Sequence, residues 1–299
     1  MSKKKKKGEF KTRYIVGLFC AALAVTLLVL IETPMMGIFV VIFSAMACYE
    51  ICHVAGMQNK AMIWVAMPVA AAVPALLEYR VFERLNLPIL LPLLAYFFLL
   101  VILMLANFDK TKFTDILIAL LASIIVPGAM ISVVLMRNLV QISNSVWEKN
   151  LVVFLIFFAF CCAWLTDTFA FLVGVNFGKT KLCPKVSPKK SVEGAVGALI
   201  LTSAANAGFA WMFNEFFLQN HTINIPVLFA LSIPLCAISM IGDLTASVFK
   251  RNFGAKDFGK IFPGHGGVMD RFDSYLFVAP AMLGLLQLQY HYGWSLFFK

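Results

Sequence analysis

Long apolar runs dominate this chain, and they constrain its fold more than any other feature. Nine runs can be read, at residues 14–31, 34–55, 61–77, 88–106, 114–136, 150–174, 195–218, 225–246 and 274–294. A bilayer core about 30 Å thick needs roughly 20 apolar residues in a helix. Apolar residues make up 61% of the chain and charged residues only 13%, with a mean hydropathy of +0.88, which excludes an ordinary soluble protein. The sequence predicts an all-α, polytopic integral membrane protein with about nine transmembrane helices.

The third run is the weakest of the nine. Residues 61–77 are few for a full crossing and include Pro68 and Pro74. A re-entrant or kinked helix would give the same pattern. Without this span, the orientation of everything before it would be reversed.

The distribution of basic residues gives a separate test of the span count. With nine spans and a cytoplasmic N-terminus, 20 of the 25 Lys and Arg residues lie in cytoplasmic segments. Residues 1–13 alone hold seven of them, and such a basic leader is also an ordinary topology anchor. We expect no cleaved signal peptide, because the first apolar run is long and no small-residue cleavage site follows it. The distribution favours nine spans with the N-terminus inside.

The cysteines indicate a reducing compartment. Six of the seven lie in apolar runs, and Cys183 lies in a predicted cytoplasmic loop, so we expect no disulfide. Cys48, Cys52 and His53 share one helical face, and packing of small side chains in an apolar helix is favoured over a metal site.

The two halves of the chain differ in polar content. Residues 1–149 are predicted to form an N-terminal transmembrane region of about five spans with little convergent polar chemistry. Residues 150–299 are predicted to form a catalytic region of about four spans, with two basic cytoplasmic loops. We therefore look for chemistry in the second half.

Asp167 lies inside an apolar run, where an ionised carboxylate costs about 2.5–3.5 kcal/mol on insertion scales. It needs a partner. Thr168, Phe171 and Gly174 continue its helical stripe. The alternative is a packing role, with hydrogen bonds to neighbouring helices.

Asp243 begins a second polar stripe, at the predicted cytoplasmic end of the eighth span. Ser247, Lys250 and Arg251 follow on the same helical face. Mg²⁺ takes carboxylate and phosphate oxygens, while Lys and Arg clamp the rest of an anion. A snorkelling Lys/Arg pair at a helix end is the ordinary alternative.

Asp270 and Asp273 are three residues apart at the start of the last span. Acids that compensate a helix dipole are the ordinary explanation for either one, but Arg271 lies between them and a glycine-rich turn precedes them. Gly264, Gly266 and Gly267 would let backbone amides approach a phosphate closely. No Walker-type motif is present.

The loop at residues 175–194 holds five lysines. We expect Ser187 and Pro188 to be the N-cap and first residue of the seventh helix. Cations at a helix N-terminus are unfavourable unless an anion lies between them, which indicates an anionic ligand. Anionic lipid headgroups are a competing explanation for this basic loop.

The stretch SVFKRNFGAKDFGKIFPGHGGVMDRFDS, residues 247–274, resembles the C-terminal signature of the phosphatidate cytidylyltransferase family. WLTDTFAFLVGVNFGKTKL and PKVSPKKSVEGAVGAL resemble other segments of that family, so the similarity covers about residues 150–275. Phe171, Ser191 and Ala198 depart from its pattern, where tyrosine, threonine and glycine are usual. These departures affect only fine positioning.

The resemblance implies transfer of a cytidylyl group from CTP to phosphatidic acid, which yields CDP-diacylglycerol and pyrophosphate in phospholipid biosynthesis. It implies a Mg²⁺ requirement and leaves room for a second cation. We expect Asp243, Asp270 and Asp273 to be metal ligands and Asp167 a further catalytic carboxylate. The expected substrate-binding residues are Ser187, Lys189, Lys190, Ser247, Lys250, Arg251, Lys256, Asp257, Gly264, His265, Gly266, Gly267 and Arg271.

The expected partners are CTP, phosphatidic acid and membrane lipid, with no nucleic acid. The resemblance leaves room for a homodimer. We expect a multi-pass protein of the cell inner membrane type whose active site faces the cytoplasm. A transporter for a phosphorylated anion is an alternative, but it predicts pseudo-symmetric halves, which this chain lacks. A CTP-dependent lipid kinase is the nearer alternative and would attack the γ-phosphorus.

Overall fold

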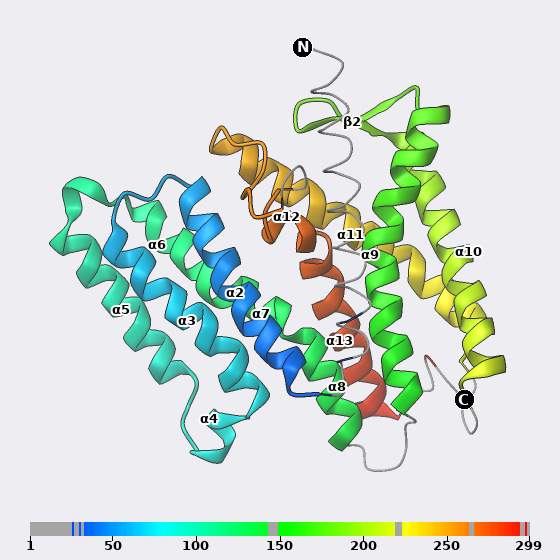
Figure 1. Ribbon diagram of the computed structural model, residues 1–299, viewed down its shortest axis with the longest axis horizontal. Coiled ribbons are helices and arrows are strands. Elements are labelled where there is room, and N and C mark those ends of the chain that lie inside the picture. Colours follow the sequence, from blue (N-terminus) through cyan, green and yellow to red (C-terminus); the bar gives the residue numbers. More distant parts are fainter. Residues whose placement is uncertain are drawn as a thin grey trace. The chain divides into compact units, whose positions relative to one another are not determined.

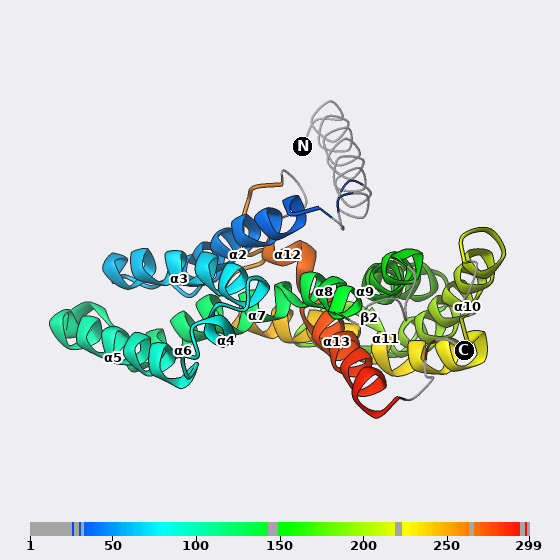
Figure 2. The same ribbon diagram turned by 90° about the horizontal axis from the view of Figure 1, so that it is seen from below.

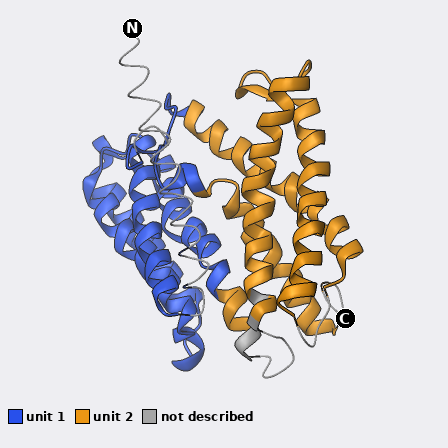
Figure 3. Ribbon diagram, turned by 45° about the vertical axis from the view of Figure 1, so that its right-hand side comes forward, with its two compact units in different colours: residues 1–134, 252–271 blue, residues 135–251, 272–299 orange. Residues whose placement is uncertain are grey.

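The computed structural model describes residues 26, 30, 33–142, 149–218, 223–262, 266–293 and 297. The chain forms two compact units (Figure 3). The first comprises residues 1–134 with 252–271, and the second comprises residues 135–251 with 272–299. The loop that follows the eighth span thus belongs to the first unit. The predicted division at residues 149 and 150 differs from this grouping and stays a prediction.

Two antiparallel helices form the start of the first unit. α2 (Met35–Val54) packs against α3 (Lys60–Glu78), side by side in both views (Figures 1 and 2). The Asn59 side chain caps α3 by accepting the N–H of Met62. Both prolines of the third apolar run lie inside α3, which continues through them as one helix. The third run is therefore one helix that is long and apolar enough to cross a membrane.

The rest of the first unit is also largely helical. Its elements are α4 (Val81–Arg84), α5 (Leu90–Ala106), the 3₁₀ turn η1 (Phe108–Lys110), α6 (Phe113–Leu120), the π-helical turn η2 (Leu121–Ile125) and α7 (Val126–Met130). α8 (Ser132–Ile142) follows and leads into the second unit. The hydroxyls of Tyr96 and Ser123 are 2.8 Å apart and join α5 to η2. This contact satisfies two polar groups buried among apolar residues.

Three long helices form the body of the second unit: α9 (Lys149–Phe177), α10 (Val192–Phe216) and α11 (Ile225–Asn252). α12 (Met269–Phe272) and α13 (Tyr275–Tyr292) follow. α9 and α10 lie side by side (Figure 1), and small residues allow their close approach. A Cβ at Gly194 would lie 2.6 Å from the carbonyl oxygen of Ala170, and one at Gly197 would lie 2.7 Å from Val173.

A buried polar layer joins the three long helices. The Asn206 amide on α10 donates to the Cys162 sulfur on α9 and to the Ser232 hydroxyl on α11, each at 3.3 Å. The Ser239 hydroxyl donates to the carbonyl oxygen of Ala163 at 3.3 Å. Because an unsatisfied polar group is costly in an apolar interior, these contacts favour a single register of the helices.

A β-hairpin connects α9 to α10. β1 (Lys181–Cys183) pairs antiparallel with β2 (Ser187–Ser191). The prediction that Ser187 and Pro188 begin the seventh helix is therefore wrong. The helix begins at Val192, and the Ser191 hydroxyl caps it by accepting the N–H of Gly194 at 3.1 Å. The physical reason is that residues 187–191 pair with β1 and so adopt the extended conformation.

The helices agree with the hydropathy pattern of the chain. Six helices are long and apolar enough to cross a membrane: Met35–Val54, Lys60–Glu78, Phe113–Leu139, Val153–Phe177, Val192–Phe216 and Ile225–Asn252. Leu90–Ala106 is a shorter apolar helix, and α13 coincides with the last predicted span. The first predicted span, 14–31, lies almost entirely outside the described residues. The molecule is thus a helical, polytopic membrane protein.

Candidate active site

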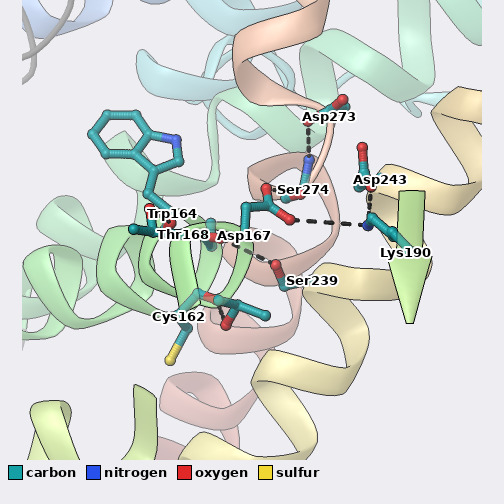
Figure 4. Close-up of polar contacts among 11 residues, drawn as sticks. Cys162, Trp164, Asp167, Thr168, Lys190, Ser239, Asp243, Asp273 and Ser274 are labelled. Carbon is teal, nitrogen blue, oxygen red and sulfur yellow. Dashed lines mark hydrogen bonds and ion pairs between the residues drawn. The ribbon is translucent and has the colours of Figure 1, made fainter. Parts of the chain in front are cut away.

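Three aspartates of the second unit form a polar cluster with one lysine. We call Asp167, Lys190, Asp243, Asp273 and Ser274 the carboxylate–lysine cluster; they come from α9, β2, α11 and the segment between α12 and α13. Figure 4 shows these side chains converging. The Ser274 hydroxyl donates to one carboxylate oxygen of Asp167 at 3.1 Å. Segments far apart in the sequence thus bring their acids together.

Lys190 is the cation of this cluster. Its ammonium group forms an ion pair with the Asp243 carboxylate and lies 4.0 Å from the other carboxylate oxygen of Asp167. The side chains of Lys190 and Asp243 are each only 21% exposed. Partial burial strengthens such a pair relative to one in water. Asp167 therefore has the partner that its position in an apolar run requires.

Asp273 is the most buried acid of the cluster. It is 8% exposed, and one of its carboxylate oxygens accepts the N–H of Ser274 at 2.8 Å. The pKa of Asp273 is raised to about 7, first by burial and then by the nearby Asp243 carboxylate, whereas Lys250 acts in the opposite direction. Burial and the neighbouring carboxylates therefore disfavour the ionised form of Asp273.

The packing of α11 explains why Asp273 lies near Asp243. A Cβ at Gly242 would lie 2.9 Å from the backbone oxygen of Asp273 and 2.8 Å from the ring of Phe277. Only glycine therefore allows this approach without a shift. Lys250, two helical turns beyond Asp243, is buried with 8% exposure. Ser247 is half-buried, and Arg251 is exposed.

A second group of acids lies in the first unit, around the loop that follows α11. The Glu50 carboxylate on α2 accepts the N–H groups of Val268 at 3.0 Å and Met269 at 2.9 Å. One oxygen of Asp270 accepts the N–H groups of Phe258 at 2.7 Å and Gly267 at 2.9 Å. The loop amides that would cradle a phosphate are, at these positions, bonded to carboxylates of the chain itself.

The glycines of this loop are required by close approach. Gly266 has φ +87°, and a Cβ there would lie 2.6 Å from the Asp270 carboxylate. A Cβ at Gly259 or at Gly267 would collide with the Glu50 carboxylate. Gly264 and His265, which the sequence also assigns to phosphate binding, lie outside the described residues.

A cavity of about 600 Å³ lies between the end of α2 and this loop. Its lining includes Glu50, Lys256 and Asp257, together with His53 and Tyr49, whose rings stack at 5.7 Å. Two of the predicted substrate-binding residues, Lys256 and Asp257, thus lie on one wall of a cavity, beside an acid that the sequence analysis did not consider.

The remaining predicted substrate-binding residues lie elsewhere on the two units. On β2, Lys189 is exposed and Ser187 is half-buried, and Arg271 on α12 is half-buried.

The cysteines Cys48, Cys52, Cys161, Cys162, Cys183 and Cys236 are free thiols. Within the described residues, no three His, Cys, Asp or Glu side chains lie close enough together to form a ready-made metal site.

The donor set nevertheless suits a hard divalent cation. Mg²⁺ usually keeps several waters and takes only one or two protein carboxylates plus substrate phosphate oxygens. Asp243 and Asp273 supply two such carboxylates in one partly buried neighbourhood, and a bound cation would reduce the repulsion between them. Asp270 belongs to the first unit, and its part in a metal site stays a prediction.

Two residues of these groups escaped the sequence analysis. Glu50 lies in an apolar helix near the end of a predicted span, where it reads as a boundary acid. For Ser274, the sequence offers no signal beyond its place after Asp273. An acid flanked by apolar residues on both sides was the available signal for Glu50, as it was for Asp167.

Comparison with known proteins identifies the family of this chain. The chain is similar to proteins named phosphatidate cytidylyltransferase from Staphylococcus haemolyticus (43% identical) and Staphylococcus aureus (42% identical), each over 134 residues. These alignments cover 45% of this chain and 49% of each relative, so the chain spans about half the length of the curated relatives it matches. A relative of the same name from Staphylococcus epidermidis is 43% identical over the same length. Residues 11–289 match the model of the cytidylyltransferase family, and the chain belongs to that family.

Proposed function

We propose that this protein transfers CMP from CTP to phosphatidic acid, which gives CDP-diacylglycerol and pyrophosphate. The observation that carries the proposal is the carboxylate–lysine cluster in a chain of the cytidylyltransferase family whose relatives are named phosphatidate cytidylyltransferase. The names of the relatives supply the lipid substrate.

The reaction needs two anionic reactants brought together more than it needs a general base. A phosphate oxygen of the lipid, already ionised at pH 7, forms a bond to the α-phosphorus of CTP. The bond from that phosphorus to the α–β bridging oxygen breaks, and pyrophosphate leaves with the electron pair. Positioning and charge stabilisation therefore supply most of the rate.

The residues of the cluster would do this work as follows. Asp243 and Asp273, with Asp270 as a further proposed ligand, would hold Mg²⁺, which supplies charge neutralisation at the phosphates when bound. Lys190 pairs with Asp243 and lies close to Asp167. When a reactant binds, its ammonium group would release one of these carboxylates and bind a phosphate oxygen instead. Lys250, Arg251, Lys189, Lys256 and Arg271 would bind the remaining phosphate charge.

We further propose that the site faces the cytoplasm of a bacterial inner membrane. The excess of Lys and Arg in the predicted cytoplasmic segments supports this orientation. CTP is a cytoplasmic reactant, and the acyl chains of the lipid must stay in the bilayer. A homodimer stays a prediction.

One labelling experiment tests the reaction. Purified protein is incubated with phosphatidic acid vesicles, Mg²⁺ and CTP labelled at the α-phosphate, and, in parallel, with CTP labelled at the γ-phosphate. Lipid labelled only from the α-phosphate is the expected result. Label from the γ-phosphate alone would identify a lipid kinase, and no label in either lipid fraction would overturn the proposal.

A further inference from the structure

Glu50 is the one buried acid of α2, and its contacts reach across more than two hundred residues of sequence. It is 3% exposed, and its two carboxylate oxygens accept separate N–H groups, Val268 at 3.0 Å and Met269 at 2.9 Å. A buried carboxylate in an apolar helix is unfavourable unless charge-assisted hydrogen bonds satisfy it. Both oxygens are satisfied by one short stretch of backbone.

The loop packs closely against this carboxylate at two glycines. A Cβ at Gly259 or Gly267 would overlap it, and a Cβ at Gly259 would also lie 3.0 Å from the Cα of Gly267. The loop therefore closes on the acid from two sides. Asp270 holds the same loop from within by accepting the N–H groups of Phe258 and Gly267.

The stretch that Glu50 holds leads directly into the proposed reaction machinery. Val268 and Met269 immediately precede Asp270 and Arg271, and Asp273 follows three residues after Asp270. The same carboxylate lines the cavity that carries Lys256 and Asp257. A change in the backbone at residues 268 and 269 would therefore displace several groups assigned to metal and phosphate.

We propose that Glu50 is a positioning residue for the cytidylyl transfer reaction: its carboxylate fixes the backbone at Val268 and Met269 and so sets the geometry of the acids that follow. This inference rests on the proposed function. Glu50 touches neither reactant in this role. Groups that orient catalytic ligands typically contribute about 10–100-fold to activity.

The test compares Glu50→Gln with wild type. Glutamine keeps one acceptor oxygen but places an NH₂ group against a backbone N–H, so one of the two hydrogen bonds is lost. The turnover number should fall about tenfold, with the KM for CTP changed less than about threefold, because positioning acts on the transition state more than on binding. Amide hydrogen exchange should become faster in peptides covering residues 258–271 and stay unchanged in α9.

Glu83→Gln is the matched control. It makes the same chemical change in the same unit, at a side chain that is 72% exposed and forms a surface ion pair with Arg80 at 3.4 Å. Turnover and loop exchange should both match wild type.

A second pair of variants tests the contact itself. Gly259→Ala places a methyl group against the Glu50 carboxylate and should lower turnover, whereas in a Glu50→Ala background the same methyl group meets less obstruction and should cost less. This non-additivity is the signature of direct contact. Strict additivity of the two changes would overturn the contact on which the inference rests.

The outcomes separate the two proposals. Wild-type turnover in Glu50→Gln overturns the positioning role, whether or not loop exchange changes. Lower turnover with unchanged loop exchange also overturns it, because the effect would then not pass through the loop. If the wild-type protein labels no lipid, the proposed function fails, while the exchange measurement still decides whether Glu50 orders the loop.

Discussion

Glu50 and Asp270 of the first unit are held by different partners from Asp167 and Asp243 of the second unit. Glu50 and Asp270 in the first unit accept hydrogen bonds from backbone N–H groups, which are fixed in number and direction. Asp167 and Asp243 in the second unit are paired with the Lys190 side chain, and Ser274 supplies a hydroxyl. A backbone amide cannot leave without unfolding a loop, whereas a lysine moves by rotating its own bonds. We therefore propose that the first group shapes the loop, with Asp270 also a proposed metal ligand, and that the second group meets the reactants.

The largest effect expected from this comparison is that of Asp243→Asn. The substitution removes a proposed metal ligand and the negative partner of Lys190, so CTP-dependent labelling of phosphatidic acid should fall by about 100-fold or more. The measurement is initial rate under saturating substrates, with the thermal midpoint of the detergent-solubilised protein recorded in parallel. Asp109→Asn, an exposed acid in η1, is the control. Near-normal turnover in Asp243→Asn would contradict the assignment of Asp243 as a metal ligand.

Asp270→Asn tests whether Asp270 acts by holding the loop or by binding the metal. Because its carboxylate accepts the N–H groups of Phe258 and Gly267, we expect turnover to fall about 10–100-fold together with faster amide exchange in residues 258–271. Asp243→Asn should leave that exchange unchanged. Loss of turnover in Asp270→Asn without any change in exchange would move Asp270 from loop shaping to metal binding alone.

The smallest effect is one of stability and concerns Asp273. Its pKa is raised from 3.8 to about 7 in the native state, so between about pH 4 and pH 7 the native state holds a proton that the unfolded chain has lost. Stability must then fall as pH rises through that window. Asp273→Asn removes this dependence and should raise the thermal midpoint at pH 8 relative to wild type, with divalent cations removed by chelator. A midpoint equal to or below that of wild type at pH 8 would contradict the raised pKa.

The sequence predicted the helical scaffold well because hydropathy over twenty residues is a strong signal. Eight of the nine predicted spans correspond to described helices or runs of helix, including α3 with its two internal prolines. It also predicted Asp167, Asp243, Asp270 and Asp273 as catalytic acids, since a charge in or beside an apolar run needs a reason to be there. The structure brings Asp167, Asp243 and Asp273 into one neighbourhood, whereas Asp270 belongs to the first unit and accepts N–H groups of its loop.

What the sequence could not predict depends on pairing between distant segments. The hairpin at residues 181–191 lies in a loop with five lysines and lacks the alternation of apolar and polar residues that is typical of strands. Ser187 and Pro188 therefore resemble the start of a helix. Nothing local to Glu50 shows that its partners are Val268 and Met269, because those contacts involve backbone groups that every residue carries. A contact of this kind cannot be recognised from the residue types of either segment.

The pairing of β1 with β2 has one more consequence for the two neighbouring lysines of the hairpin. Successive side chains of a strand project to opposite faces, and here Lys190 is paired with Asp243 while Lys189 is exposed. The two adjacent lysines therefore differ in orientation: Lys190 faces the carboxylates, and Lys189 faces away from them. Inserting or deleting a single residue in this strand would exchange their orientations, so the segment should tolerate changes of side chain more readily than changes of length.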